Sequence, residues 1–240
     1  MKPHVSILML TSADGSLHPS RFTTSPEGTR RDWSAQYENV HSSLHGNAWL
    51  VGRVTMAEMS KSQAHVPPAP WQVQRPIHIA KSSAQTFGIA LDPGGKVHLQ
   101  GGKVAGDDVI VLLGPNVPDS HLAELAADGV SYIVSQSADV DIPAALEVLA
   151  RDFGVRHLIV EGGAATNGAF LAAGVVDEFH VLIAPAMEGP QNLQGIVSHR
   201  DGLAGRVEFR LKSSHVLDHG VVQLTYEVSS YNGGHERKSH

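Results

Sequence analysis

The sequence predicts an α/β fold in which a mixed sheet is flanked by helices. Short apolar, β-branched runs alternate with stretches of helical periodicity almost from end to end, which is typical of that fold class. The last two runs are separated by the turn-forming Asp218-His219-Gly220, which predicts an antiparallel hairpin, so the sheet is not wholly parallel. Ten predicted strands in one chain favour one broad sheet over two domains, and we expect a single domain over residues 1–230.

The predicted strands share apolar or β-branched side chains without helical periodicity. In chain order they are His4–Leu10, Ala48–Val51, Pro76–Ala80, Lys96–Leu99, Asp108–Leu113, Val130–Val134, Val155–Val160, Glu178–Ala184, Glu208–Leu217 and Val221–Val228.

The predicted helices carry apolar side chains three and four residues apart. The clearest is Pro143–Phe153, where the proline suits a first turn and the following Gly154 suits a C-terminal cap. The others are Ser34–Leu44, Val54–Ser60, Ser120–Ala127 and Thr166–Ala173.

Two segments predict irregular structure. Three prolines beside a tryptophan between Ser60 and Arg75 favour an extended loop at the rim of the domain. The Gly-rich, charged stretch from Tyr231 to His240 has few apolar residues, so we expect a disordered tail over residues 231–240.

Composition excludes several functional classes. The chain has no Cys, which excludes disulfides, thiolate metal sites and a cysteine nucleophile. A net charge of -6, without clustered Lys and Arg, argues against nucleic acid as a partner. No apolar run approaches the roughly 18 residues of a membrane span, and the first fifteen residues lack a signal-peptide core. We therefore expect a soluble, unanchored, cytoplasmic protein.

The strongest local signal is a glycine pair between a strand and a helix. Glu161-Gly162-Gly163 follows an apolar strand, and Ala164 and Thr166 open the next helix. Glycines let backbone N–H groups turn toward a ligand, and a helix N-terminus favours phosphate, so the segment is a candidate pyrophosphate cradle. Alternatively, the two glycines only turn the chain.

A second junction of the same kind lies at Gly52. Arg53 supplies a fixed positive charge there, Thr55 offers a hydroxyl near a helix N-terminus, and Met56 follows. Two such junctions predict a ligand with two phosphate-bearing parts. The alternative is that Arg53 is only a solvated surface charge.

Four weaker candidates are polar or aromatic residues near other predicted strands and helices. Lys81 and Ser82 follow a predicted strand, where an ammonium and hydroxyls could bind a terminal phosphomonoester. Asp14 lies where the first strand ends, and Trp33 precedes the first helix. An Asp-Gly turn and a core tryptophan are the ordinary alternatives for the last two.

The sequence carries no established motif for a metal site, a phosphate loop or a nucleophile elbow. His41 with His45, and His215 with His219, have helical ligand spacing, but no H-E-x-x-H accompanies them and no metal site is predicted. Neither the G-x-x-x-x-G-K-[ST] of phosphate loops nor the G-x-S-x-G of nucleophile elbows occurs.

Read in order, these segments resemble the dihydrofolate-reductase-like superfamily, and most closely the reductase domain of the bifunctional riboflavin-biosynthesis deaminase-reductase. Ser12–Gly15 is similar to that family's S-x-D-G, and Val51–Met56 to the G-R-x-T-W of dihydrofolate reductases. The most specific match is to the series E-G-G-x-x-x-N-G, G-L-V-D-E and I-A-P, in the segments Glu161–Gly168, Gly174–Glu178 and Ile183–Pro185.

The resemblance implies a dihydrofolate-reductase-like domain with a mixed, mostly parallel sheet and a C-terminal antiparallel hairpin. It implies a homodimer that binds NADPH across the carboxyl ends of central strands and transfers a hydride to a pyrimidine- or pteridine-like small molecule. The expected cofactor-binding residues are Gly52, Arg53, Thr55, Met56, Lys81, Ser82, Gly162, Gly163, Ala164 and Thr166. Asp14, Trp33 and Glu161 are expected to face the substrate, with one of the two acids handling the proton.

Two departures from the family pattern concern the substrate side. Leu8 stands where the riboflavin reductases usually carry a Lys, and Met56–Met59 stands where they carry A-D-D-P. The first choice is reduction of 5-amino-6-ribosylaminouracil 5′-phosphate. Reduction of another small heterocycle or carbonyl compound, a flavin- or deazaflavin-dependent reductase, and a nucleotide-binding module without catalysis remain alternatives. No deamination is expected from these residues.

Overall fold

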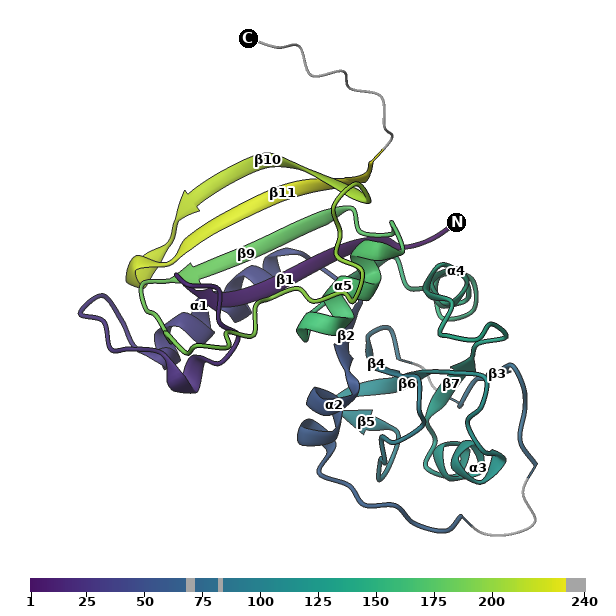
Figure 1. Ribbon diagram of the computed structural model, residues 1–240. Helices are drawn as coiled ribbons and strands as arrows, with labels where there is room; N and C mark the ends of the chain where they lie inside the picture. Colours follow the sequence, from purple (N-terminus) through teal and green to yellow (C-terminus); the bar gives the residue numbers. More distant parts are fainter. Residues whose placement is uncertain (68–71, 82–83, 232–240) are drawn as a thin grey trace.

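The computed structural model describes residues 1–67, 72–81 and 84–231, and within them one 11-stranded mixed sheet organises the chain (Figure 1). The strands are β1 (His4–Ser12), β2 (Ala48–Gly52), β3 (Ile77–His78), β4 (Phe87–Asp92), β5 (Lys103–Val104), β6 (Asp107–Leu113), β7 (Ser131–Val134), β8 (His157–Val160), β9 (Glu178–Ala184), β10 (Val207–Val216) and β11 (Val222–Ser230). The helices are α1 (Arg30–Ser43), α2 (Arg53–Ser60), α3 (Asp119–Ala127), α4 (Ile142–Asp152) and α5 (Ala164–Ala172), with 3-10 turns η1 (Pro19–Arg21) and η2 (Asp218–Gly220).

The sheet is parallel at its centre and antiparallel at its ends. Its strand order is β10-β11-β9-β1-β8-β2-β4-β6-β7-β3, with β5 paired to β6. All pairs from β9 to β7 are parallel, whereas β10, β11, β3 and β5 pair antiparallel with their neighbours. This confirms the predicted fold class, a mixed and mostly parallel sheet with a C-terminal hairpin.

Helices cover both faces of the sheet because side chains along each strand alternate between the faces. Along β1, Ile7 and Met9 join the cluster that contains residues of α4 and α5, whereas Leu8 between them joins the cluster that contains residues of α1. Helices α2 and α3 pack with β2, β6 and β7 in a third cluster. Figure 1 shows α1 and α5 on opposite sides of β1.

The predicted C-terminal hairpin is confirmed. Strands β10 and β11 pair antiparallel around η2, where His219 has a left-handed φ of 60°. The hairpin extends the sheet beyond β9, since β11 pairs with β9 from Val222 to Glu227. The predicted tail lies outside the described residues, apart from Tyr231.

The prediction of a strand at Lys96–Leu99 is wrong, because this segment pairs with no strand of the described sheet. The backbone N–H groups of Lys96 and Val97 donate to the Asp92 carboxylate at 2.5 and 2.7 Å, which folds the chain back at the end of β4. Val97 and Leu99 are fully buried, so their apolar character reflects core packing without strand pairing.

The sequence analysis missed β4, whose six residues are all buried. Gly88 has little strand propensity, which hides the pattern. The glycine is required because a Cβ there would lie 2.5 Å from the ring of Trp49, its neighbour across the β2–β4 pair. The two-residue β5 was missed as well.

Candidate active site

A cleft of about 560 Å³ opens at the carboxyl edge of the central parallel strands. The N-termini of α2 and α5 and the loop after β1 surround it. Its lining residues are Met9, Leu17, His18, Gly52, Arg53, Val54, Thr55, Glu58, Glu161, Gly163, Ala164, Ala165, Thr166 and Gln194. Seven of the thirteen predicted site residues are among them: Gly52, Arg53, Thr55, Glu161, Gly163, Ala164 and Thr166.

The two glycine junctions meet at this edge. The backbone N–H of Gly52 donates to the carbonyl oxygen of Gly162 at 2.9 Å. A Cβ at Gly52 would lie 2.7 Å from Oγ1 of Thr166, so no larger residue fits there without a shift. Gly162 has a φ of 94°, and a Cβ on it would lie 3.0 Å from the Met9 methyl group. The contact with Thr166 of α5 explains the glycine at position 52, and the positive φ together with the nearby Met9 of β1 explains the glycine at position 162.

Both helices that begin at the cleft have a glycine as N-cap. Gly52 caps α2 and Gly163 caps α5, and neither helix receives a side-chain hydrogen bond at its cap. By contrast, Asp141 caps α4 by accepting from the N–H of Ala144 at 3.0 Å. The first-turn N–H groups of α2 and α5 are therefore available to an anionic ligand, which the positive ends of the helices also favour.

The space in front of these caps is open. A Cβ built on Gly163 would meet no atom within 4 Å. Arg53 is exposed at the first position of α2 and, within the described part of the chain, makes no ion pair. The Arg53 guanidinium and the free N–H groups form a donor set for phosphate oxygens. The open space in front of them fits the diphosphate of a dinucleotide.

Glu161 lies on the wall of the cleft and pairs with α1. The hydroxyl group of Tyr37 donates to its Oε1 at 2.6 Å, and Nε2 of His41 lies 3.7 Å from the same oxygen. Burial raises the pKa of Glu161, although the hydrogen bond from Tyr37 and the nearby His41 oppose the shift. Burial first, and then Glu161, raises the pKa of Tyr37 well above 10, so the phenol stays a hydrogen-bond donor. The pair can hold a proton beside the cleft.

Asp14 holds a loop and does not line the cleft. Its carboxylate accepts from the Ser12 hydroxyl at 2.5 Å, from the Gly189 N–H at 2.7 Å and from the Glu188 N–H at 3.2 Å. The Ser12 hydroxyl and then the Gly189 N–H keep the pKa of Asp14 below its ordinary range. A carboxylate that binds these donors anchors the loop around residue 188.

Trp33 and Met56 belong to the core. Trp33 is 2% exposed, packs against Phe22 and donates from Nε1 to the His219 carbonyl at 3.3 Å. Met56 is the fully buried residue of α2. The structure brings neither side chain to the cleft, although their predicted roles concern the same end of the sheet.

Lys81 lies at the opposite edge of the sheet from the cleft. The resemblance implies a cofactor across the carboxyl ends of central strands, but β3 pairs antiparallel with β7, and the Ala80 N–H donates to Ser131 at the amino end of β7. A strand that runs the other way ends at the amino edge, so the placement of Lys81 in the cofactor site is corrected. Ser82 lies outside the described residues.

Two residues at the carboxyl edge were missed. Tyr37 lies within the predicted helix Ser34–Leu44, and nothing in its spacing indicates that it contacts Glu161. Lys96 is exposed in the turn after β4, the strand next to β2. The Gly94-Gly95-Lys96 sequence was a usable signal for a turn, but Lys96 was assigned to the start of a predicted strand because β4 was not predicted.

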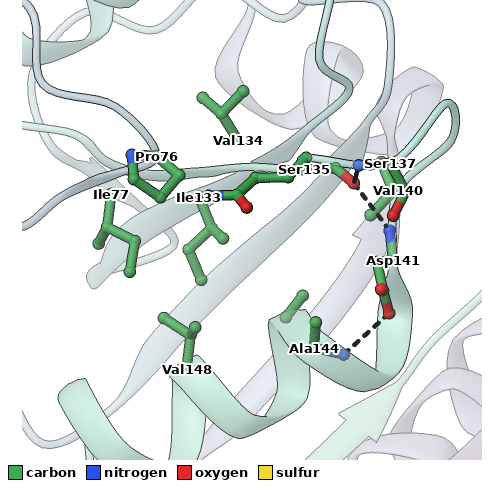
Figure 2. Close-up of a pocket in the computed structure, with 12 residues that line it drawn as sticks. Pro76, Ile77, Ile133, Val134, Ser135, Ser137, Val140, Asp141, Ala144 and Val148 are labelled. Atoms are coloured by element: carbon green, nitrogen blue, oxygen red, sulfur yellow. Dashed lines mark hydrogen bonds between the residues drawn. The ribbon is translucent and has the colours of Figure 1, made fainter.

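A smaller hollow of about 280 Å³ lies between α4 and the ends of β3 and β7 (Figure 2). Figure 2 shows Ile133 and Val148 on its apolar wall. Among the described residues that line it, Asp141 alone is charged, and its carboxylate is engaged in capping α4. This hollow therefore lacks the convergent polar groups that mark a site of chemistry.

In the described part of the chain, no helix has the length and apolar character that crossing a membrane requires.

Comparisons with known proteins agree with this geometry. A family model described as the RibD C-terminal domain matches residues 3–223. The 2,5-diamino-6-ribosylamino-4(3H)-pyrimidinone 5′-phosphate reductase of Methanothermobacter thermautotrophicus is 29% identical over 124 residues, which are 50% of this chain and 56% of that protein. The riboflavin biosynthesis protein RibD of Bacillus amyloliquefaciens is 28% identical over 201 residues, which are 82% of this chain and 49% of that protein. The chain thus spans about half the length of the curated relatives it matches.

Solved structures share the fold. A pyrimidine reductase-like protein from Corynebacterium diphtheriae superposes with a TM-score of 0.62 at 18% identity, over 94% of this chain and 92% of that one. The riboflavin biosynthesis reductase Rib7 of Saccharomyces cerevisiae superposes with a TM-score of 0.59 at 16% identity, over 95% and 90% of the two chains. The resemblance inferred from the sequence is confirmed by the family match, and the chain belongs to the RibD C-terminal domain family.

Proposed function

We propose that the chain is an NADPH-dependent reductase that transfers a hydride to a pyrimidine-like small molecule. The first choice of substrate is 5-amino-6-ribosylaminouracil 5′-phosphate, reduced in riboflavin biosynthesis. The observation that carries the proposal is the meeting of two glycine-capped helix N-termini at one cleft, joined by the hydrogen bond from Gly52 to Gly162. Two adjacent helix N-termini that can bind anions match a ligand with a diphosphate.

One group of residues in the cleft is suited to bind the phosphates of the cofactor. On the cofactor side, the N–H groups at the starts of α2 and α5 bind phosphate oxygens, and Arg53 neutralises their charge. Bound NADPH supplies the hydride, and the protein contributes orientation and electrostatics. Gly163 leaves the space that a phosphate needs.

Glu161 is the acid that handles the accompanying proton. It lines the cleft, its pKa is raised by burial, and Tyr37 fixes its Oε1. Asp14, the other candidate, has a lowered pKa and is occupied with loop N–H groups. A carboxyl group that keeps its proton to higher pH is the better donor near neutrality.

The choice of substrate draws on the names of relatives and on the family. One of the two relatives described above is named a 2,5-diamino-6-ribosylamino-4(3H)-pyrimidinone 5′-phosphate reductase, and the other is named a riboflavin biosynthesis protein. The chain departs from the family pattern on the substrate side, because Leu8, which is fully buried, stands where the family usually has a Lys. This difference favours a second possible substrate. Another small heterocycle or a carbonyl compound is therefore the alternative substrate.

The proposal is tested by following the absorbance of NADPH with the purified chain and the ribosylaminopyrimidine phosphate. Consumption of NADPH that requires the pyrimidine supports the first choice. Consumption only with other heterocycles or carbonyl compounds supports the alternative substrate. Thermal stabilisation by NADPH without turnover identifies a binding module, and the absence of any stabilisation by NADPH contradicts the cofactor assignment. A bound chromophore would identify a flavin or deazaflavin enzyme.

The expectations of a homodimer and of a cytoplasmic location stay predictions. Light scattering of the purified chain measures the first, and fractionation of the source cells measures the second.

A further inference from the structure

Three histidines and two carboxylates from α3, its C-cap and the segments that follow α2 and β4 lie close together, and none of them lines the cleft. A ring nitrogen of His98, a ring nitrogen of His121 and a carboxylate oxygen of Glu124 all lie within 4.8 Å of one another. A second group of His65, Glu124 and Asp128 shares the same glutamate. Glu124 is therefore the centre of the cluster.

The contacts around Glu124 are short. Nδ1 of His98 lies 2.7 Å from its Oε1, and Nδ1 of His65 lies 3.3 Å from the same oxygen. Nε2 of His65 lies 3.1 Å from Oδ2 of Asp128. The side chain of Glu124 is 6% exposed, so it is a buried acid surrounded by imidazoles.

Hydrogen bonds inside the cluster leave His121 poorly paired. Its Nδ1 is 3.8 Å from Oε2 of Glu124, which is longer than a hydrogen bond, and its Nε2 has no partner although the side chain is 5% exposed. Its ring packs edge-on against that of His98, with centroids 5.4 Å apart. An unpaired buried polar group costs free energy, and a ligand at this position would remove that cost.

The residue types indicate which ligand fits. Two imidazoles and one carboxylate form a nitrogen and oxygen donor set that zinc and related divalent transition metals prefer. Magnesium and calcium prefer oxygen ligands alone, which this set does not provide.

We propose that His98, His121 and Glu124 bind a divalent metal of the zinc class, with His65 supporting Glu124 from the adjacent loop. His98 lies in the irregular segment after β4, His121 and Glu124 lie on α3, and His65 follows α2. The metal would join these three parts of the chain. The site shares no residue with the cleft, so the proposal is independent of the proposed reductase function.

Spacing along the sequence does not indicate this site. It applies to histidines a few residues apart, such as His41 and His45, whereas the ligands here come from separate segments. The fold alone brings them together.

The test uses the full chain, stripped with a chelator and dialysed against metal-free buffer. Zinc alone is then added in competition with a chromophoric chelator, and bound zinc is counted by mass spectrometry. We expect one equivalent of zinc per chain and a higher unfolding temperature with zinc present. His98→Gln and Glu124→Gln should each weaken zinc binding by at least about a hundredfold, and His65→Gln by about tenfold.

The matched control is His215→Gln, which removes an exposed histidine of β10 and should leave zinc binding unchanged. His98→Gln is the decisive variant if Glu124→Gln fails to fold, because the side chain of His98 is 27% exposed. Zinc binding that His98→Gln and His65→Gln leave intact would overturn the proposal, as would the absence of bound zinc in the parent chain. Cobalt should give the visible spectrum of a nitrogen-ligated ion, and His98→Gln should abolish it.

Discussion

Gly52 and Gly162 lie against each other at the ends of neighbouring strands, with the N–H of Gly52 donating to the carbonyl oxygen of Gly162 at 2.9 Å. Each glycine sits next to the start of a helix without a side-chain cap. One hydrogen bond therefore fixes the relative position of two anion-binding helix ends. The predictions below test whether these ends hold a cofactor and whether Glu161 serves the reaction beside them.

Gly163→Val should abolish NADPH binding while the chain still folds. The backbone there, with φ of -68°, suits any residue, and a Cβ meets no atom within 4 Å. The branched side chain would instead fill the space proposed for a phosphate. Calorimetric titration with NADPH measures the loss, and circular dichroism checks the fold. Gly163→Ala should weaken NADPH binding to an intermediate degree. An unchanged affinity for NADPH in the valine variant would contradict the proposed phosphate-binding site at Gly163.

Lys96→Ala should weaken NADPH binding by about 1.5–3 kcal/mol, or roughly 10- to 150-fold, and NADH binding much less. Lys96 is exposed in the turn after β4, at the same edge of the sheet as the cleft, and we propose it as the cation that meets a 2′-phosphate. Lys81→Ala is the matched control, since Lys81 is exposed at the other edge. Titration of both variants with both dinucleotides decides the assignment. Selective loss of NADPH in Lys81→Ala would restore the original prediction.

Glu161→Gln should reduce turnover by about 100- to 10,000-fold, as expected when an acid–base group is removed. Its effect on stability should depend on pH. A carboxyl group whose pKa is raised above its ordinary 4.5 by folding stabilises the fold below pH 4.5, and this contribution is lost as the pH rises through the raised value. The difference in free energy of unfolding between the variant and the parent should therefore shift in favour of the variant as the pH rises from acid to neutral. Urea unfolding at a series of pH values measures this. A constant difference would mean that the pKa is not raised.

Tyr37→Phe should shift the pH–rate profile to higher pH. The hydrogen bond from Tyr37 lowers the pKa of Glu161, so its removal raises that pKa further. The loss of a buried hydrogen bond should also cost about 1–3 kcal/mol of stability. The pH dependence of kcat/KM measures the shift. In the Glu161→Gln background, Tyr37→Phe should no longer move the profile, and a shift that persists there would assign it to another group.

Trp33→Ala should destabilise the fold by about 3–5 kcal/mol, which is typical of a large side chain removed from a core. Trp33→Phe should retain most of the stability and the full turnover, because Trp33 is 2% exposed and faces Phe22 and His219. Urea unfolding and steady-state kinetics measure the two quantities. Loss of turnover in a stable Trp33→Phe variant would favour the predicted contact with substrate.

Local patterns identified most of the secondary structure and the two glycine junctions. The turn at Asp218–Gly220 predicted the hairpin because turn chemistry is local. The direction of a strand is not local: Lys81 was misplaced because the sequence does not state that β3 runs against β7. The partnership of Tyr37 with Glu161 was hidden for the same reason, since the two residues meet only across packed elements.

The strand order has a consequence for synthesis on the ribosome. β8 lies between β1 and β2 in the sheet, although both precede it by more than a hundred residues. Until β8 emerges, the nascent chain holds two apolar strands whose facing edges have no partner, and unpaired edges invite contact between chains. Fragments that end before residue 157 should therefore self-associate. The pair of helix N-termini proposed to bind the cofactor needs Gly162, so it cannot assist the earlier steps of folding.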